Sequence, residues 1–254
     1  MHLCLSHTAA SPEHNALLLA PSRTKLQEGL KAFNDDWIDE RGGHGSTSKS
    51  AMKVQMLYPP TAAHLALVLT ALHTSDVGGK EAFVPKATLP TTPSLIVICE
   101  LSSYLVDNPA STVSSYLMLV TQTLTSIAAL SSTTGSDTAL AIYDSGLDSL
   151  RLPLVRPPSP NAFQIKVEGG EDNTRRESVG FLAARYFEWV GIVHAVRGDP
   201  AGEEENEVNG ETRMCRMELR HSARGQESEI TWQWMERKKK ILSSPGYSTV
   251  FEWS

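Results

Sequence analysis

Short apolar runs alternate with segments of helical periodicity through the first 150 residues, and this alternation constrains the fold more than any other feature. The clearest run extends from Ser94 to Leu101, and its unbroken apolar centre is typical of a parallel strand covered on both faces. Further strands are expected at Ala16 to Ala20, Met52 to Tyr58 and Thr138 to Tyr143, and helices at Ser22 to Arg41, Thr61 to Leu72 and Ser111 to Ser131. These repeated strand–helix units predict an α/β fold with a mainly parallel sheet flanked by helices.

The pattern changes after Asp144. Residues 150–160 are rich in proline, and strand-like segments follow at Arg185 to Val196, Met214 to His221 and Ile230 to Glu236. We expect them to extend the sheet at its C-terminal end as antiparallel strands. The expected organisation is a single domain over residues 1–254, with a strand–helix core at 15–150, loops and antiparallel strands at 151–240, an acidic mobile loop at 199–212 and a tail at 241–254.

Composition places the chain among globular proteins, because 41% of its residues are apolar and 20% are charged. Cys4, Cys99 and Cys215 are odd in number and far apart, which favours reduced thiols in a cytosolic or nuclear compartment. The longest apolar runs are shorter than the roughly 20 residues that cross a bilayer, so no membrane association is expected. The His and Cys spacing matches no metal motif, and no G-x-S-x-G nucleophile motif occurs.

The formal net charge is −6, yet cations cluster near the C-terminus. Residues 213–240 contain 8 basic and 4 acidic side chains. We predict that nucleic acid binds there, through Arg216, Arg220, Arg237, Lys238, Lys239 and Lys240. The run from Arg237 to Lys240 also suits a nuclear import signal, and the alternative is a solvated strand end.

Three tryptophans accompany these cations. Trp189, Trp232 and Trp234 could stack on nucleotide bases, but such residues more often fill a core, and burial in the core is the favoured prediction.

Three stretches resemble the RecA-like recombinase core: Ala16 to Ala20 with the helix that follows it, Pro93 to Leu105, and Phe181 to Gly191. The resemblance extends from about residue 15 to residue 240. The chain is similar in particular to the diverged recombinase paralogs of Shu-type complexes. These paralogs pair with a SWIM-domain protein and promote recombinase filaments. The resemblance implies a nuclear, non-catalytic subunit in DNA repair by homologous recombination, with a SWIM-domain protein or another recombinase paralog as partner and single-stranded or branched DNA as a further ligand.

The chain departs from that family where the ATPases bind nucleotide. The phosphate-binding motif G-x-x-x-x-G-K-[ST] is missing, and the nearest segment is Gly43 to Ser50, in an expected polar loop. If Leu3 to Leu5 is a remnant of the first core strand, about ten residues separate it from Ala16, too few for a phosphate loop and its helix. The P-loop is therefore expected to be deleted, and no cofactor is predicted.

Cys99 and Glu100 occupy the position that resembles Walker B, where an ATPase uses an Asp to hold Mg²⁺ through water. We expect Glu100 to anchor a loop instead. The resemblance also places Arg151 and Arg156 in the region of the recombinase DNA-binding loops. Two alternatives stay open: an atypical NTPase that uses Gly43 to Ser50, and an Elongator-like RecA-fold subunit that binds tRNA.

Overall fold

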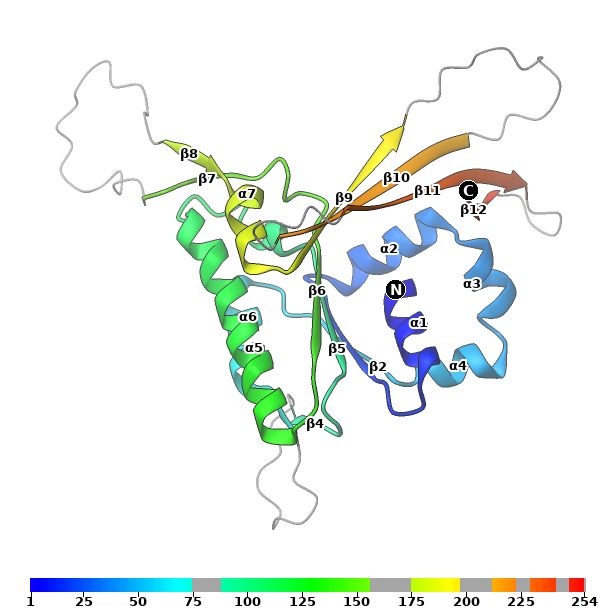
Figure 1. The fold of residues 1–254 in the computed structure, drawn as a ribbon, viewed down its shortest axis with the longest axis horizontal. Helices are drawn as coiled ribbons and strands as arrows, with labels where there is room; N and C mark the ends of the chain where they lie inside the picture. The colour runs from blue at the N-terminus through cyan, green and yellow to red at the C-terminus, as the bar shows by residue number, and fades with distance from the viewer. Residues whose placement is uncertain (75–87, 156–174, 197–211, 223–228, 241–246, 254) are drawn as a thin grey trace, which may run out of the picture. The chain divides into compact units, whose positions relative to one another are not determined.

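The computed structural model describes residues 1–254 except 75–87, 156–174, 197–211, 223–228, 241–246 and 254 (Figure 1). Its contacts divide the chain into two compact units. The first comprises residues 1–23 and 49–183, and the second comprises residues 24–48 and 184–254. Arg156 and nearly all of the acidic segment at 199–212 lie outside the described residues.

A four-stranded parallel sheet forms the centre of the first unit. Its strands are β1 (Ala16–Leu19), β2 (Val54–Leu57), β5 (Leu95–Cys99) and β6 (Ala139–Tyr143), in the order β2-β1-β5-β6. All three neighbouring pairs are parallel, so the predicted α/β class and all four predicted strands of this sheet are confirmed. Every residue of β1 is buried, as are Leu95 to Ile98 of β5, because helices cover both faces at the middle of the sheet.

Helices α5 (Ala62–Ala71) and α6 (Val113–Thr134) pack together on one face of this sheet, and α1 (His2–Ala10) lies on the other (Figure 1). Thr61 caps α5 as its sequence predicts, since its hydroxyl accepts from the His64 N–H at 3.2 Å. Thr112 and Ser115 form a capping box at the start of α6, and Gly135 ends it in the left-handed region. Both helices were predicted and are confirmed.

Helix α6 is long and apolar enough to cross a membrane by length and composition alone. Its side chains nevertheless contribute to the core of the unit, where Tyr116, Leu119 and Val120 are at most 1% exposed. A core helix of a globular unit passes the same test of length and composition, and 39% of this helix is buried.

The N-terminal segment overturns one prediction. Leu3 to Leu5 lies in α1, whose Cys4 and Leu5 pack into the core, and is no strand remnant. The deletion argument drawn from the spacing of Leu3 to Leu5 and Ala16 therefore fails. β1 is the first strand of the described sheet.

Smaller elements complete the first unit. They are β3 (His73–Thr74) paired with β4 (Thr88–Leu89), the 3₁₀ helix η1 (Leu101–Tyr104), β7 (Arg151–Pro153) paired with β8 (Arg176–Ser178), and α7 (Val179–Ala183). Arg151 is thus the first residue of β7.

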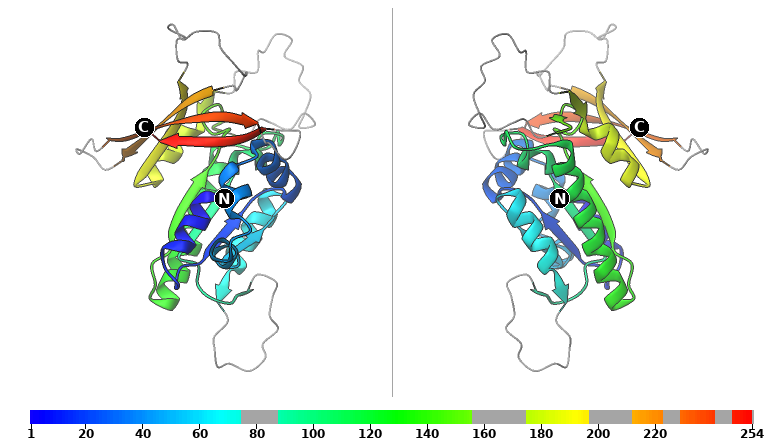
Figure 2. Two further views of the ribbon diagram at one scale, coloured as in Figure 1. Left: turned by 90° about the vertical axis from the view of Figure 1, so that its right-hand side faces the viewer. Right: turned by 90° about the vertical axis from the view of Figure 1, so that its left-hand side faces the viewer.

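The second unit contains an antiparallel sheet in the order β12-β11-β10-β9 (Figure 2). Its strands are β9 (Trp189–Val196), β10 (Thr212–His221), β11 (Glu229–Lys240) and β12 (Tyr247–Trp253), and the 3₁₀ helix η2 (Ala184–Tyr186) precedes them. The strands predicted after Asp144 exist, but the prediction that they extend the parallel sheet is wrong, because they pair only among themselves in the described chain. The segment predicted as a tail contains β12, which had not been predicted.

The helix predicted from Ser22 to Arg41 is divided into α2 (Arg23–Phe33) and α3 (Asp36–Arg41). Asn34 adopts a left-handed conformation with φ 47° and donates through Nδ2 to the Tyr247 carbonyl at 2.6 Å. The Thr249 N–H donates to the Asn34 carbonyl at 2.7 Å, so this corner is tied to β12. The predicted loop at Gly42 to Ser50 is wrong as well, because Gly45–Ala51 forms helix α4.

Candidate functional site

The carboxyl edge of the parallel sheet places Glu100 beside the loop that follows β6. Glu100 comes directly after Cys99, the last residue of β5, and has a φ of 54°. Its carboxylate accepts from the Ser145 hydroxyl at 2.8 Å, and its N–H donates to the Tyr143 carbonyl at 2.7 Å. Glu100 therefore ties the ends of two neighbouring strands together, which is the anchoring role its sequence position suggested.

Asp144, immediately after β6, is the centre of a second hydrogen-bond cluster at this edge. Its carboxylate accepts from the Ser102 N–H at 2.7 Å, from the Ser102 hydroxyl at 2.5 Å and from the Gly146 N–H at 3.1 Å. Burial raises the pKa of the nearby Tyr116 hydroxyl, and the charge of Asp144 and a hydrogen bond to it raise that pKa further. A Cβ at position 146 would lie 2.7 Å from the Ser102 Oγ, so only glycine fits this turn without displacement.

These contacts limit the chemistry available at this edge. Both carboxylates accept hydrogen bonds from the chain itself, and burial raises the pKa of the Cys99 thiol, which favours the unreactive protonated form. Within the described ranges, no three His, Cys, Asp or Glu side chains gather as metal ligands. The edge is thus built as a strand-joining network.

The strand-to-helix turn after β1 is the place where a parallel sheet of this kind would offer N–H groups to phosphate. Only Ala20, Pro21 and Ser22 separate Leu19 from Arg23, the first residue of α2. The Ala20 N–H already donates to the Leu57 carbonyl at 3.1 Å, and Pro21 has no N–H. Two of the three turn residues therefore cannot donate to a phosphate.

The segment Gly43 to Ser50 is mostly helical instead of a loop. It contributes six residues to α4, where the Ser48 N–H donates to the His44 carbonyl at 3.0 Å. The atypical NTPase alternative that uses Gly43 to Ser50 stays a prediction.

The six predicted DNA-binding cations all lie on β10 and β11, but the strand register divides them between the two faces of the sheet. Residues directly opposite each other share a face, and Arg216 lies opposite Gln233 while Arg220 lies opposite Glu229. Alternation from these pairs places Arg216, Arg220, Arg237 and Lys239 on one face and Lys238 and Lys240 on the other.

Carboxylates neutralise the cations of the first face. Glu218 pairs with Arg216 at 3.2 Å and with Arg220 at 2.9 Å. Arg237 forms an ion pair with Glu252, and the Lys239 ammonium lies 3.8 Å from the Asp36 carboxylate. This face therefore carries less excess positive charge than the sequence suggested.

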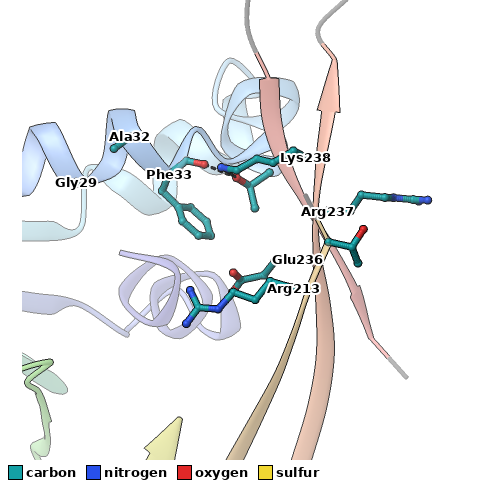
Figure 3. A pocket seen from close by; sticks show the side chains of 9 residues that line it. Gly29, Ala32, Phe33, Arg213, Glu236, Arg237 and Lys238 are labelled. Atoms are coloured by element: carbon teal, nitrogen blue, oxygen red, sulfur yellow. Dashed lines mark hydrogen bonds between the residues drawn. The ribbon is translucent and has the colours of Figure 1, made fainter. Parts of the chain in front are cut away.

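The second face contains a cation that the sequence analysis did not single out. Arg213 lies opposite Glu236 and lines a cavity of about 660 Å³ between α2 and the sheet, together with Phe33, Lys238 and Thr249 (Figure 3). Figure 3 shows Arg213 on the side of the strands that faces the Phe33 ring, and Arg237 pointing away from it. Strict alternation along β10 was the available signal, since it places Arg213 opposite in direction to Arg216.

Lys238 and the neighbouring strand fix one wall of this cavity. The Lys238 ammonium donates to the Thr249 hydroxyl at 3.0 Å, and that hydroxyl donates to the Phe33 carbonyl. In the part of the chain that the structure describes, no carboxylate forms an ion pair with Arg213 or Lys240.

The tryptophans of the antiparallel sheet are more exposed than predicted. Trp189 is 38% exposed and Trp232 is 37% exposed, so the expectation that they fill a core is wrong. Trp234 is half-buried and donates from its indole N–H to the Glu236 carboxylate at 3.1 Å.

Neither a protein-family model nor a curated protein sequence matches this chain.

Proposed function

We propose that this chain is a RecA-like recombinase paralog that performs no ATP chemistry and supports homologous recombination through protein–protein contacts and weak DNA binding. The turn after β1 is the observation that carries the proposal, because Ala20 and Pro21 offer phosphate no free N–H. The four-stranded parallel sheet with helices on both faces supports the RecA-like interpretation.

The carboxyl edge of the sheet supports a non-catalytic role. Glu100 stands at the position that resembles Walker B, and its carboxylate is engaged by Ser145. The expected partner is a SWIM-domain protein or another recombinase paralog, and the expected compartment is the nucleus.

Nucleotide binding by the purified full chain tests the proposal. A fluorescent ATP analogue with Mg²⁺ should show no saturable binding, while a RecA-fold ATPase with an intact phosphate loop binds it in the same assay. Micromolar affinity for the analogue, or ATP turnover above background, would overturn the proposal.

Co-expression tests the protein contacts. A SWIM-domain protein should co-elute with this chain in stoichiometric amount during size-exclusion chromatography. Preference for tRNA over DNA of equal charge, together with no co-elution, would favour the Elongator-like alternative over the recombination subunit.

A further inference from the structure

One face of the antiparallel sheet carries an apolar surface that the described chain leaves open. We call it the tryptophan face, and it consists of side chains from β9, β10 and β11: Trp189, Val193, Met217, Leu219, Ile230 and Trp232. The register places Met217 between Val193 and Trp232, and Leu219 next to Ile230, so these side chains adjoin across three strands.

Exposure of this surface is substantial. Val193 is 52% exposed and Ile230 is 41% exposed, in addition to the two tryptophans at 38% and 37%. Contiguous exposed apolar surface on a folded unit marks a site of interaction. The tryptophan face is therefore a candidate site of interaction.

Cations lie on the same side of the same strands. Arg213, Lys238 and Lys240 share the face with Trp232, and Arg213 precedes Met217 by four residues, about 13 Å along an antiparallel strand at roughly 3.4 Å per residue. That distance corresponds to about four nucleotides at the ~3.4 Å spacing along one strand of nucleic acid. No ion pair joins a carboxylate to Arg213 or Lys240 in the described residues, although Glu236 lies opposite Arg213 on this face.

We propose that single-stranded nucleic acid binds across the tryptophan face, with bases stacked on Trp189 and Trp232 and phosphates on Arg213, Lys238 and Lys240. Exposed indoles and cations on one face of the sheet match the two parts of a nucleotide, its base and its phosphate. A duplex buries the faces of its bases, so it would contact only the cations. This inference rests on the DNA binding in the proposed function and specifies the ligand as an unpaired strand.

Fluorescence anisotropy with the full chain tests the inference. The probes are a labelled 30-nucleotide thymidine strand, a 30-nucleotide abasic strand of the same charge and a 30-base-pair duplex. The thymidine strand should bind most tightly. Trp232→Ala and Trp189→Ala should each weaken binding about 5- to 150-fold, which corresponds to about 1 to 3 kcal/mol of stacking per base, and should leave binding of the abasic strand unchanged.

Trp37→Ala is the matched control, because Trp37 is also 37% exposed but lies on α3. It should bind the thymidine strand as the unaltered chain does. Circular dichroism of each variant shows whether the fold is retained, and a double variant Trp232→Phe/Trp189→Phe, which keeps an aromatic ring at each position, should retain most of the affinity.

The possible outcomes separate this inference from the proposed function. If folded tryptophan variants bind the thymidine strand normally while alanine at Arg237 to Lys240 abolishes binding, the stacking surface is refuted and DNA binding stands. If the tryptophan variants lose only co-elution with the protein partner, the tryptophan face is a protein interface and the inference is refuted. If no probe binds at all, the inference fails, and the nucleotide and co-elution experiments still decide the proposed function.

Discussion

At the scale of single residues, a histidine pair links the N-terminal helix to the parallel sheet. The rings of His7 and His14 stack with centroids 4.4 Å apart and planes 6° from parallel. The His7 Nε2 hydrogen bonds to the Ser94 hydroxyl at 2.7 Å, immediately before β5. Burial lowers the pKa of His7, and the neighbouring His14 lowers it further. The folded chain therefore favours the neutral ring.

This shift predicts how the stability of the chain depends on pH. An unfolded histidine has a pKa of about 6.5, so below that value the unfolded chain binds more protons at His7 than the folded chain does. The free energy of unfolding should therefore decrease as the pH falls from 7 to 5. Urea denaturation at several pH values measures it.

Two variants isolate the contribution of His7. His7→Gln should flatten this pH dependence, while Ser46→Gln, at an exposed position without a titratable group, should leave it unchanged. An equal slope in the unaltered chain and in His7→Gln would contradict the assignment.

At the scale of elements, sequence patterns predicted a strand or helix correctly where neighbouring residues determine its burial and its ends. The run Leu95 to Cys99 is apolar throughout and forms the buried centre of the sheet, and the helix predicted from Ser111 to Ser131 is α6, which Thr112 caps. Leu3 to Leu5 was misassigned because three residues with two leucines fit a buried helix as well as a strand. Gly42 to Ser50 was misassigned because its polar composition resembles a loop, although most of it folds as α4.

Capping of α6 gives a prediction at this scale. Thr112→Ala removes the hydroxyl that accepts from the Ser115 N–H at 3.3 Å and should lower the free energy of unfolding by about 1 kcal/mol. Thr125→Ala is the control, because Thr125 is exposed in the same helix, where alanine has the higher helix propensity. Denaturant titration compares the two variants, and equal stability would show that the cap contributes nothing.

At the scale of the whole molecule, the net charge of −6 opposes nucleic acid, so any binding depends on local excess charge. Three cations on the tryptophan side of the sheet provide it. The logarithm of the affinity for single-stranded DNA should fall with the logarithm of salt concentration with a slope of about −2, from about −0.7 per phosphate contact.

Alanine at Arg213, Lys238 and Lys240 should bring that slope close to zero. Arg216→Ala with Arg220→Ala should change it much less, because Glu218 pairs with both cations. Anisotropy titrations between 50 and 300 mM salt measure these slopes. Over this range the Debye length falls from about 14 Å to about 6 Å. If the Arg216→Ala/Arg220→Ala variant changed the salt slope more than alanine at Arg213, Lys238 and Lys240, the binding site would lie on the opposite face of the sheet.

The amino-acid sequence by itself determined the α/β class, the four parallel strands and the positions of the cations, because periodicity and composition are properties of neighbouring residues. Only the tertiary structure decided that the later strands form a sheet of their own, that Glu218 and Glu252 neutralise the predicted arginines, and that Trp189 and Trp232 are exposed. Strand partners, counter-charges and burial depend on residues distant in the chain, and no local pattern specifies which of them meet.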